Sequence, residues 1–148
     1  MAIPTRILVP VDFSPSSDHA LDFAVALAAA LDATVYLLNV IAVPTFGIEE
    51  IGIALTSSVM ADLVRTNQAA VDDLVEARKD RAKLAAGMLR TGDPRDTIVQ
   101  VAHEIGADLI VMGTHGRRGL TRALLGSVAE AIVRTSPIPV VTLRLVKG

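Results

Sequence analysis

Residues 7–41 decide the fold, and they read ILVPVDFSPSSDHALDFAVALAAALDATVYLLNVI. Both ends, residues 7–11 and 34–41, are short apolar runs rich in β-branched residues, which predict buried strands. Between them, Ser14 fits a helix N-cap and Pro15 fits the first helical position, where its missing N–H costs nothing. Apolar residues then recur at helical spacings: Ala20, Leu21, Ala24, Leu27, Ala28 and Leu31. The segment therefore predicts a strand, a helix and a second strand, the repeating unit of a parallel sheet.

The rest of the chain continues this alternation. The expected elements are a helix from Met60 to about Asp80, a weaker edge strand at 83–90, a helix introduced by Asp93 and Pro94, a buried strand at 108–112, a helix that begins with the capping box 127–130, and a last strand at 138–146. Residues 44–58 show no clear period and predict a long connection. Five strands joined by helical crossovers indicate one α/β domain over residues 1–148, with a parallel sheet covered on both faces.

The composition excludes several classes of protein. With 51% hydrophobic and 20% charged residues in 148, the chain is not generally disordered. Aromatic residues make up only 3%, which argues against stacking on nucleic-acid bases or on a flavin. Fourteen basic and 16 acidic residues give a net charge of −2, so no bulk attraction to nucleic acid or anionic membrane is expected. The absence of cysteine excludes disulfides, thiolate zinc sites and a cysteine nucleophile.

Targeting and membrane segments are not expected. The longest apolar run, Phe23 to Leu31, is shorter than the ~20 residues that span a bilayer. The N-terminus enters a strand directly and lacks the layout of a signal peptide. We therefore expect a cytoplasmic protein with no membrane and no nucleic-acid partner.

Unusual residues follow two of the predicted strands. Asp12 follows the first strand, and the glycine-rich stretch GTHGRRG, residues 113–119, follows the fourth. Ligands of open α/β sheets bind beyond the carboxyl ends of the strands, where the strand order reverses. If the first and fourth strands are neighbours there, the order is 3-2-1-4-5, and Asp12 faces the glycine loop across one crevice.

These residues have the chemistry of a nucleotide site. Glycines let backbone N–H groups approach an anion and tolerate positive φ, and a helix N-terminus at Gly126 and Ser127 favours phosphate. An ionised Asp12 suits the hydroxyls of a ribose. We therefore predict phosphates at Gly116, Gly126 and Ser127, ribose at Asp12, and the base over the end of the second strand near Val40.

The basic side chains of the loop allow two interpretations. His115 has no acidic partner nearby in sequence, which favours a solvent-facing loop residue over a catalytic base. Arg117 is typical of a solvated residue, and it is also long enough to reach a terminal phosphate. His19 and His103 lie on polar stretches of predicted helices, and no histidine pair has metal-ligand spacing, so no metal held by protein side chains is expected.

The spacing Gly113-x2-Gly116-x9-Gly126-Ser127 resembles the pattern of the ATP-binding branch of the universal stress protein family. The stretch VMGTHGRRGLTRALLGSVAE at 111–130 looks like the signature of that family. Similar pieces extend over essentially the whole chain: ILVPVDFS at 7–14, GDP at 92–94, GADLIVMG at 106–113 and SPIPVV at 136–141. The resemblance implies a flavodoxin-like, Rossmann-like doubly wound sheet, a homodimer, and binding of ATP or another adenine nucleotide, usually with a divalent cation such as Mg²⁺.

The resemblance also assigns roles to residues. Asp12 matches the acidic residue that binds ribose, and Val40 lines the adenine. The other positions expected to contact the nucleotide are Pro10, Val11, Met112, Gly113, His115, Gly116, Arg117, Gly126, Ser127 and Val128; among them, Met112 and Gly113 border the adenosine, and Gly116, Gly126, Ser127 and Val128 hold phosphates.

Two functions compete for this site. The first is a stress-response regulator or sensor that binds ATP with little or no turnover, because no convincing catalytic pair is evident. The second is a slow ATP-hydrolysing enzyme in which Asp12 or His115 guides water. A flavin site or a phospho-receiver is disfavoured, since aromatic platforms are scarce and Asp12 stands alone after the first strand. The last strand, 138–146, would be an exposed edge, which predicts a symmetric homodimer through it.

Overall fold

The computed structural model describes residues 2–42, 53–115 and 125–145. Within them, one six-stranded sheet has the order β3-β2-β1-β5-β6, with β4 also pairing with β2, and the strand pairs are parallel. The elements are β1 (Arg6–Pro10), α1 (Pro15–Leu31), β2 (Thr34–Ile41), α3 (Ile53–Glu76), β3 (Lys83–Leu84), β4 (Met88–Thr91), α4 (Pro94–Ile105), β5 (Leu109–Gly113), α5 (Ser127–Thr135) and β6 (Val140–Leu143).

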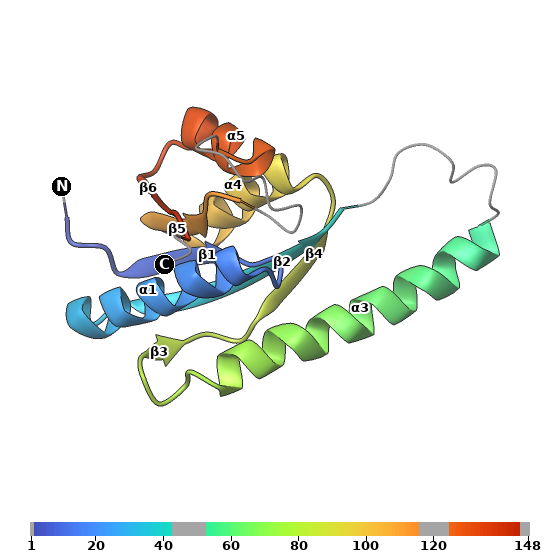
Figure 1. Cartoon of the computed structure of the whole chain (residues 1–148), viewed down its shortest axis with the longest axis horizontal. Helices are drawn as coiled ribbons and strands as arrows, with labels where there is room; N and C mark the ends of the chain where they lie inside the picture. The colour runs from blue at the N-terminus through green and yellow to red at the C-terminus, as the bar shows by residue number, and fades with distance from the viewer. Residues whose placement is uncertain (1, 43–52, 116–124, 146–148) are drawn as a thin grey trace.

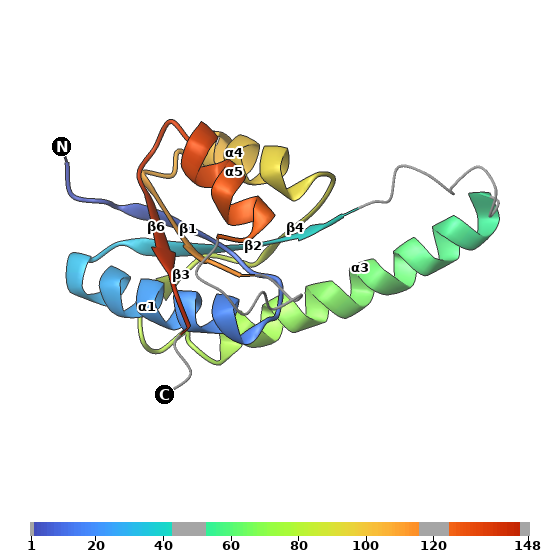
Figure 2. The same ribbon diagram turned by 45° about the horizontal axis from the view of Figure 1, so that its top comes forward.

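Helices cover both faces of this sheet. Helices α1 and α3 lie on one face, and α4 and α5 lie on the other (Figures 1 and 2). Strand β1 alternates between the two sides: Ile7 and Val9 pack with α1, whereas Leu8 joins the cluster under α4 and α5. This two-sided burial explains the near-continuous apolar run that predicted the strand. The predicted doubly wound parallel sheet is confirmed. Its strand order differs slightly from the predicted 3-2-1-4-5, because six strands form instead of five and both β3 and β4 pair with β2 in the place of the third strand, followed on the other side of β1 by β5 and β6.

The third predicted strand is interrupted. Instead of one strand over 83–90, the chain forms β3 and β4, which pair with successive parts of β2. The break contains Gly87, where an added Cβ would lie 2.1 Å from Cγ1 of Val71 on α3. Helix α3 packs so closely on this edge that a side chain at position 87 would collide with it. The prediction of one continuous strand was therefore wrong.

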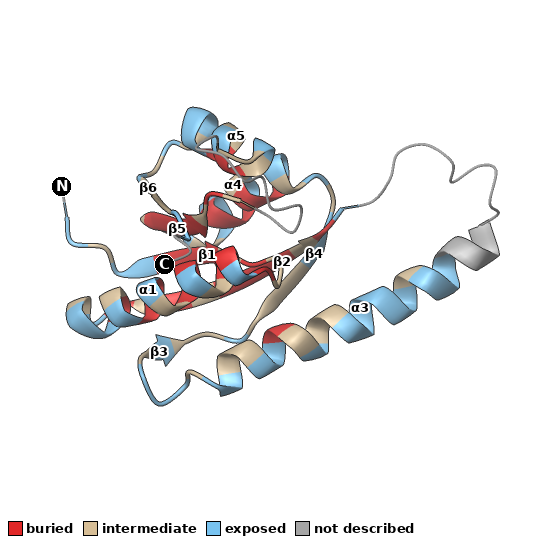
Figure 3. Cartoon of the chain, viewed as in Figure 1, coloured by how far each residue is buried: buried red, intermediate tan, exposed pale blue. Residues whose placement is uncertain are grey.

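Helix α3 differs most from its predicted bounds. It begins at Ile53 rather than Met60 and ends at Glu76 rather than near Asp80, so residues 53–58 are helical and not part of a long connection. Residues 44–52 of that predicted connection lie outside the described residues. Side chains 57–66 are almost all exposed (Figure 3). A helix turn with exposed side chains needs no apolar face, so its sequence carries no helical apolar periodicity.

The predicted caps of two helices are confirmed. The Ser14 hydroxyl accepts a hydrogen bond from the Ser17 N–H at the start of α1, and the Asp93 carboxylate accepts one from the Arg95 N–H at the start of α4. Strand β6 is shorter than the predicted 138–146 and forms the edge of the sheet beside β5. Among the described helices, none combines the length and apolar character needed to cross a bilayer.

Candidate functional site

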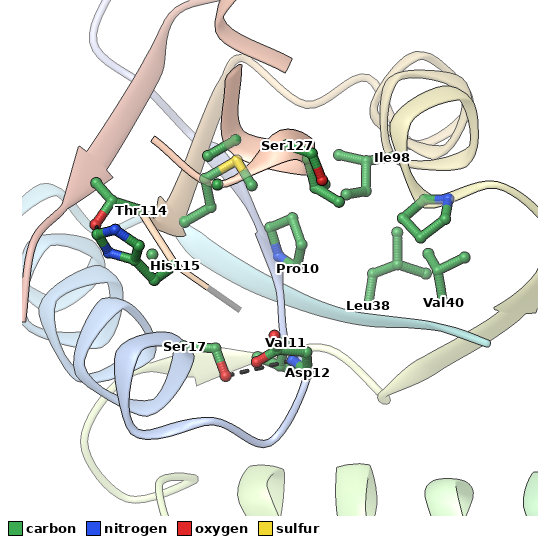
Figure 4. A pocket seen from close by; sticks show the side chains of 16 residues that line it. Pro10, Val11, Asp12, Ser17, Leu38, Val40, Ile98, Thr114, His115 and Ser127 are labelled. Atoms are coloured by element: carbon green, nitrogen blue, oxygen red, sulfur yellow. Dashed lines mark hydrogen bonds between the residues drawn. The ribbon is translucent and has the colours of Figure 1, made fainter. Parts of the chain in front are cut away.

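A pocket of about 470 Å³ opens at the carboxyl ends of β1, β2 and β5. Its far walls come from the first turns of α4 and α5, so it lies at the point where the strand order reverses (Figure 4). Ten of the predicted site residues line it: Pro10, Val11, Asp12, Val40, Met112, Gly113, His115, Gly126, Ser127 and Val128. Gly116 and Arg117 lie outside the described residues. The structure thus brings the described part of the predicted set together, while their roles in binding stay predictions.

Asp12 sits in a tight turn between β1 and α1. Its carboxylate accepts a hydrogen bond from the Ser14 N–H at 3.0 Å, and its own N–H donates to the Ser17 hydroxyl at 3.3 Å (Figure 4). The next residue, Phe13, has φ of 65°, a left-handed conformation that costs about 1 kcal/mol or more for a bulky side chain. The surrounding hydrogen bonds offset this strain and hold the carboxylate at the mouth of the pocket.

One side of the pocket is apolar. Leu38, Val40 and Ile98 lie together there, whereas Thr114 and His115 lie on the opposite side (Figure 4). Leu38 and Val40 are two residues apart on β2 and so share one face of the sheet. A flat apolar wall of this kind suits the faces of an aromatic ring, and the polar groups opposite suit a polar substituent.

Gly113 ends β5 against the first turn of α1. An added Cβ would lie 2.3 Å from the Ser16 hydroxyl oxygen and 2.9 Å from the Ser16 carbonyl oxygen. Among the described glycines, positive φ occurs at Gly92 and Gly106 and not at Gly113. The need for glycine at this position is therefore close packing of a strand against a helix, not the conformational freedom expected for the loop.

Helix α5 begins differently from the prediction. Its N-cap is Gly126, Ser127 is the first helical residue, and no side chain of the described residues caps the helix, so the predicted capping box was wrong. The Gly126 N–H donates to the Thr114 carbonyl oxygen at 2.6 Å, which fixes Gly126 at the cap position. Glu130 pairs with Arg134 at 2.7 Å instead of turning back to the helix start. The first-turn N–H groups of α5 and the exposed Ser127 side chain consequently face the pocket without a capping side chain.

The chain is similar to known proteins over most of its length. The sequence model of the Universal stress protein family matches residues 4–144. The universal stress protein MJ0531 of Methanocaldococcus jannaschii is 34% identical over 143 residues, which cover 94% of this chain and 81% of that protein. The chain belongs to the universal stress protein family. Its parallel sheet flanked by helices is the flavodoxin-like fold of that family.

Two solved structures resemble the chain over nearly its whole length. The structure of the hypothetical protein MJ0577 superposes with a TM-score of 0.85 at 28% identity and covers 97% of this chain and 98% of that one. The structure of a universal stress protein in complex with cAMP superposes with a TM-score of 0.63 at 26% identity. The superposition covers 97% of this chain and 98% of that protein's chain.

Six residues that line the pocket of this universal stress protein were not predicted from its sequence. They are Ser17, Leu38, Pro94, Ile98, Thr114 and Ala129. Two signals were available: Leu38 shares a strand face with Val40, and Pro94 begins a helix at the carboxyl edge, which places Ile98 one turn further along the same helix side. Thr114 stands between the predicted Gly113 and His115, which was a third signal, whereas Ser17 and Ala129 enter the pocket through the packing of α1 and α5, which no local pattern reports.

The histidines divide between surface and pocket. His19 and His103 are exposed, as predicted. His115 is half-buried and lines the pocket, and its Nδ1 lies 3.0 Å from the Thr114 hydroxyl oxygen, so it is less exposed than a fully solvent-facing loop residue, while its role stays a prediction. Within the part of the chain that the structure describes, no three His, Asp or Glu side chains gather as a metal site.

Proposed function

We propose that this universal stress protein is a stress-response regulator or sensor that binds an adenine nucleotide, ATP first among them, with little or no turnover. The observation that carries the proposal is the pocket itself, which joins an apolar wall, a carboxylate and a helix N-terminus without a capping side chain. These three surfaces match a base, a ribose and phosphates in that order. The family member solved in complex with cAMP supports an adenine nucleotide as the ligand class.

Each part of the nucleotide has a partner in this proposal. The base lies against Leu38, Val40 and Ile98, and the ribose hydroxyls donate to the Asp12 carboxylate. The phosphates take the first-turn N–H groups of α5 and the Ser127 hydroxyl, where the helix dipole stabilises each charge by about 0.3–1 kcal/mol. Gly116 belongs to the phosphate site by its match to the family pattern, and Arg117 is long enough to reach a terminal phosphate.

The expected affinity is micromolar. The pocket volume of about 470 Å³ lies in the range of small-molecule sites. However, the sequence lacks the phosphate-binding lysine of a Walker loop. Asp12 is the only carboxylate among the described lining residues, so Mg²⁺ fits this site as an ion carried by the phosphates, with the Ser127 hydroxyl as a further oxygen ligand.

Slow ATP hydrolysis is the second candidate function. It is favoured by one observation, the half-buried His115 that lines the pocket beside the Thr114 hydroxyl. A single-turnover experiment separates the two candidates, because a regulator releases bound ATP intact after hours. Steady conversion to ADP that is lost in His115→Ala would instead establish the enzyme.

A second copy of the chain is the proposed protein partner. Strand β6 is a sheet edge whose residues 140–143 are all half-buried, and Leu145 beyond it is 39% exposed. Such an edge offers both unpaired backbone groups and apolar surface for pairing with its own copy, through residues 138–146. Sedimentation of the full chain as a monomer at high concentration would contradict this dimer.

Thermal unfolding with added nucleotide tests the proposed function. ATP with Mg²⁺ at about 100 times its Kd adds ~2.7 kcal/mol of stability, which raises the Tm by about 5–11 °C for a chain of this size. We expect Asp12→Ala to abolish most of this shift. The exposed Asp73→Ala on α3 removes the same charge far from the pocket and should keep it. No shift at millimolar ATP, ADP, AMP or cAMP would overturn the proposal.

A further inference from the structure

A buried amide lies behind the turn that carries Asp12. Asn39 in β2 is only 4% exposed, and its side chain points to the opposite face of the sheet from its neighbours Leu38 and Val40, which line the pocket. Its Nδ2 donates a hydrogen bond to the carbonyl oxygen of Val11 at 2.8 Å. A polar group buried this deeply persists where it is paired, and here its partner is the residue before Asp12.

A second amide extends this contact to helix α3. Nδ2 of Asn67 donates to Oδ1 of Asn39 at 3.0 Å. The hydrogen bonds therefore run from α3 through Asn67 and Asn39 to the Val11 carbonyl. We refer to these three linked groups as the amide chain.

The amide chain and helix α1 hold the two ends of one peptide unit, its carbonyl group and its N–H group. The Val11 carbonyl belongs to the same peptide as the Asp12 N–H, and that N–H donates to the Ser17 hydroxyl. Strand β1 ends at Pro10, so side chains rather than a sheet ladder set the orientation of this peptide. Rotation of this peptide plane would swing the Asp12 side chain, so the two side-chain hydrogen bonds that hold the peptide also hold the direction of the carboxylate.

Helix α3 has few other anchors near Asn67. Val71 is its buried side chain among residues 57–76, and Asn67 lies one turn before it. The turns that precede Asn67 are exposed, with Val59, Leu63 and Val64 in solvent (Figure 3). A helix attached mainly through its second half has low local stability at this boundary, so the position of Asn67 can respond to events on the exposed half.

We propose that Asn39 and Asn67 are positioning residues, and that the amide chain aims the Asp12 carboxylate at the ribose and makes nucleotide affinity depend on how α3 is seated. The proposal rests on the proposed function for its ligand. It predicts an effect of Asn67, on the opposite side of the sheet from the base, that is specific for the sugar hydroxyls.

The test compares Asn67→Ala with Gln68→Ala in the full-length protein. Gln68 is the next residue on α3, and its amide bonds to Asp72 of the same helix, so its removal deletes an amide without breaking the amide chain. Calorimetric titrations use two probes, ATP and 2′,3′-dideoxy-ATP, which lacks the hydroxyls that Asp12 would accept from. We expect Asn67→Ala to weaken ATP about three- to tenfold, the equivalent of one hydrogen bond, and dideoxy-ATP less than about twofold.

A readout without ligand keeps the two proposals separable. The Ser14 N–H donates to the Asp12 carboxylate, so its hydrogen exchange reports how firmly the carboxylate is held. We expect faster exchange at Ser14 in Asn67→Ala, and also in Asn67→Asp, which removes the donor but keeps the size. Gln68→Ala should exchange like the wild type.

The outcomes decide each proposal. Faster exchange at Ser14 with a loss confined to ATP supports the amide chain. Unchanged exchange at Ser14, or equal losses for both probes, overturns it and leaves Asn67 with a purely structural role. Absence of nucleotide binding by the wild type overturns the proposed function instead, and the Ser14 exchange then decides by itself whether α3 holds the Asp12 turn.

Discussion

Replacing Gly113 by alanine should force α1 and β5 apart at the mouth of the pocket. The added Cβ would lie 2.3 Å from Oγ, 2.9 Å from the carbonyl oxygen and 3.0 Å from the carbonyl carbon of Ser16. The Oγ contact can be relieved by rotation of the side chain. The two backbone atoms belong to the first turn of α1, so they move only if the helix start moves with them.

The cost follows from overpacking. Forcing a methyl group into a closed contact destabilises a protein by about 1–3 kcal/mol. For a domain of about 150 residues, each kcal/mol lowers the Tm by about 2–4 °C, so Gly113→Ala should unfold about 2–12 °C earlier. Nucleotide affinity should fall as well, because Ser17, which accepts from the Asp12 N–H, lies on the displaced turn.

The matched variant is Ser16→Ala, which removes the hydroxyl and keeps the backbone contacts. Ser16 Oγ is buried without a hydrogen-bond partner among the described residues, so Ser16→Ala by itself should be neutral or stabilising, by up to about 1 kcal/mol. Thermal and urea unfolding of the two single variants and the double variant measure the coupling. We expect the double variant to remain less stable than Ser16→Ala. A Gly113→Ala protein within about 0.5 kcal/mol of the wild type would refute the close approach of strand and helix.

Three further outcomes follow from the structure. Asp108 accepts hydrogen bonds from the N–H groups of Thr5 and Arg6 and from the Thr5 hydroxyl; burial alone would raise its pKa, but these bonds outweigh burial and hold the pKa below its ordinary value. Because the pKa of Asp108 is lower in the folded protein than in the unfolded chain, this stabilisation is present above about pH 4 and is lost as the pH falls through the folded pKa. Asp108→Asn should therefore lower the free energy of unfolding by about 1–3 kcal/mol at neutral pH and by progressively less in acid. Urea unfolding at several pH values measures both effects. Ser127→Ala should change the free energy of unfolding by less than about 0.5 kcal/mol, since Ser127 is not the N-cap of α5, and calorimetry should show weaker ATP binding. A loss of about 1 kcal/mol in stability would instead indicate that the Ser127 hydroxyl caps the helix. Gly87→Ala should destabilise by about 1–3 kcal/mol through its contact with Val71, and the double variant with Val71→Ala should lose less than the sum of the two single losses, which a double-mutant cycle measures.

Much of the fold and of the site could be predicted because the relevant physics is local. The apolar runs at 7–11 and 34–41, and the caps Ser14 and Asp93 with their following prolines, act within a few residues of one another. The position of Asp12 at a strand end then follows from the rule that parallel strands share their carboxyl edge. These features place the pocket before any tertiary contact is known.

The start of α3 could not be predicted in this way. Apolar periodicity reports a helix only where one side of it is buried, and residues 57–59, whose side chains the structure describes, are exposed. The connection expected at 44–58 therefore included residues that belong to the helix.

The sequence by itself determined the alternation of strands and helices, their parallel order and the residue types at the strand ends, since capping and periodicity depend on near neighbours. Tertiary structure alone decided that Gly126 rather than Ser127 caps α5, because the deciding bond comes from Thr114, twelve residues away. It also decided that residue 113 must be glycine because α1 packs against it, and that Asn39 on β2 links Asn67 on α3 to the Asp12 turn. Each of these depends on distances of about 3 Å between segments far apart in the chain, and such distances exist only once the layers have packed.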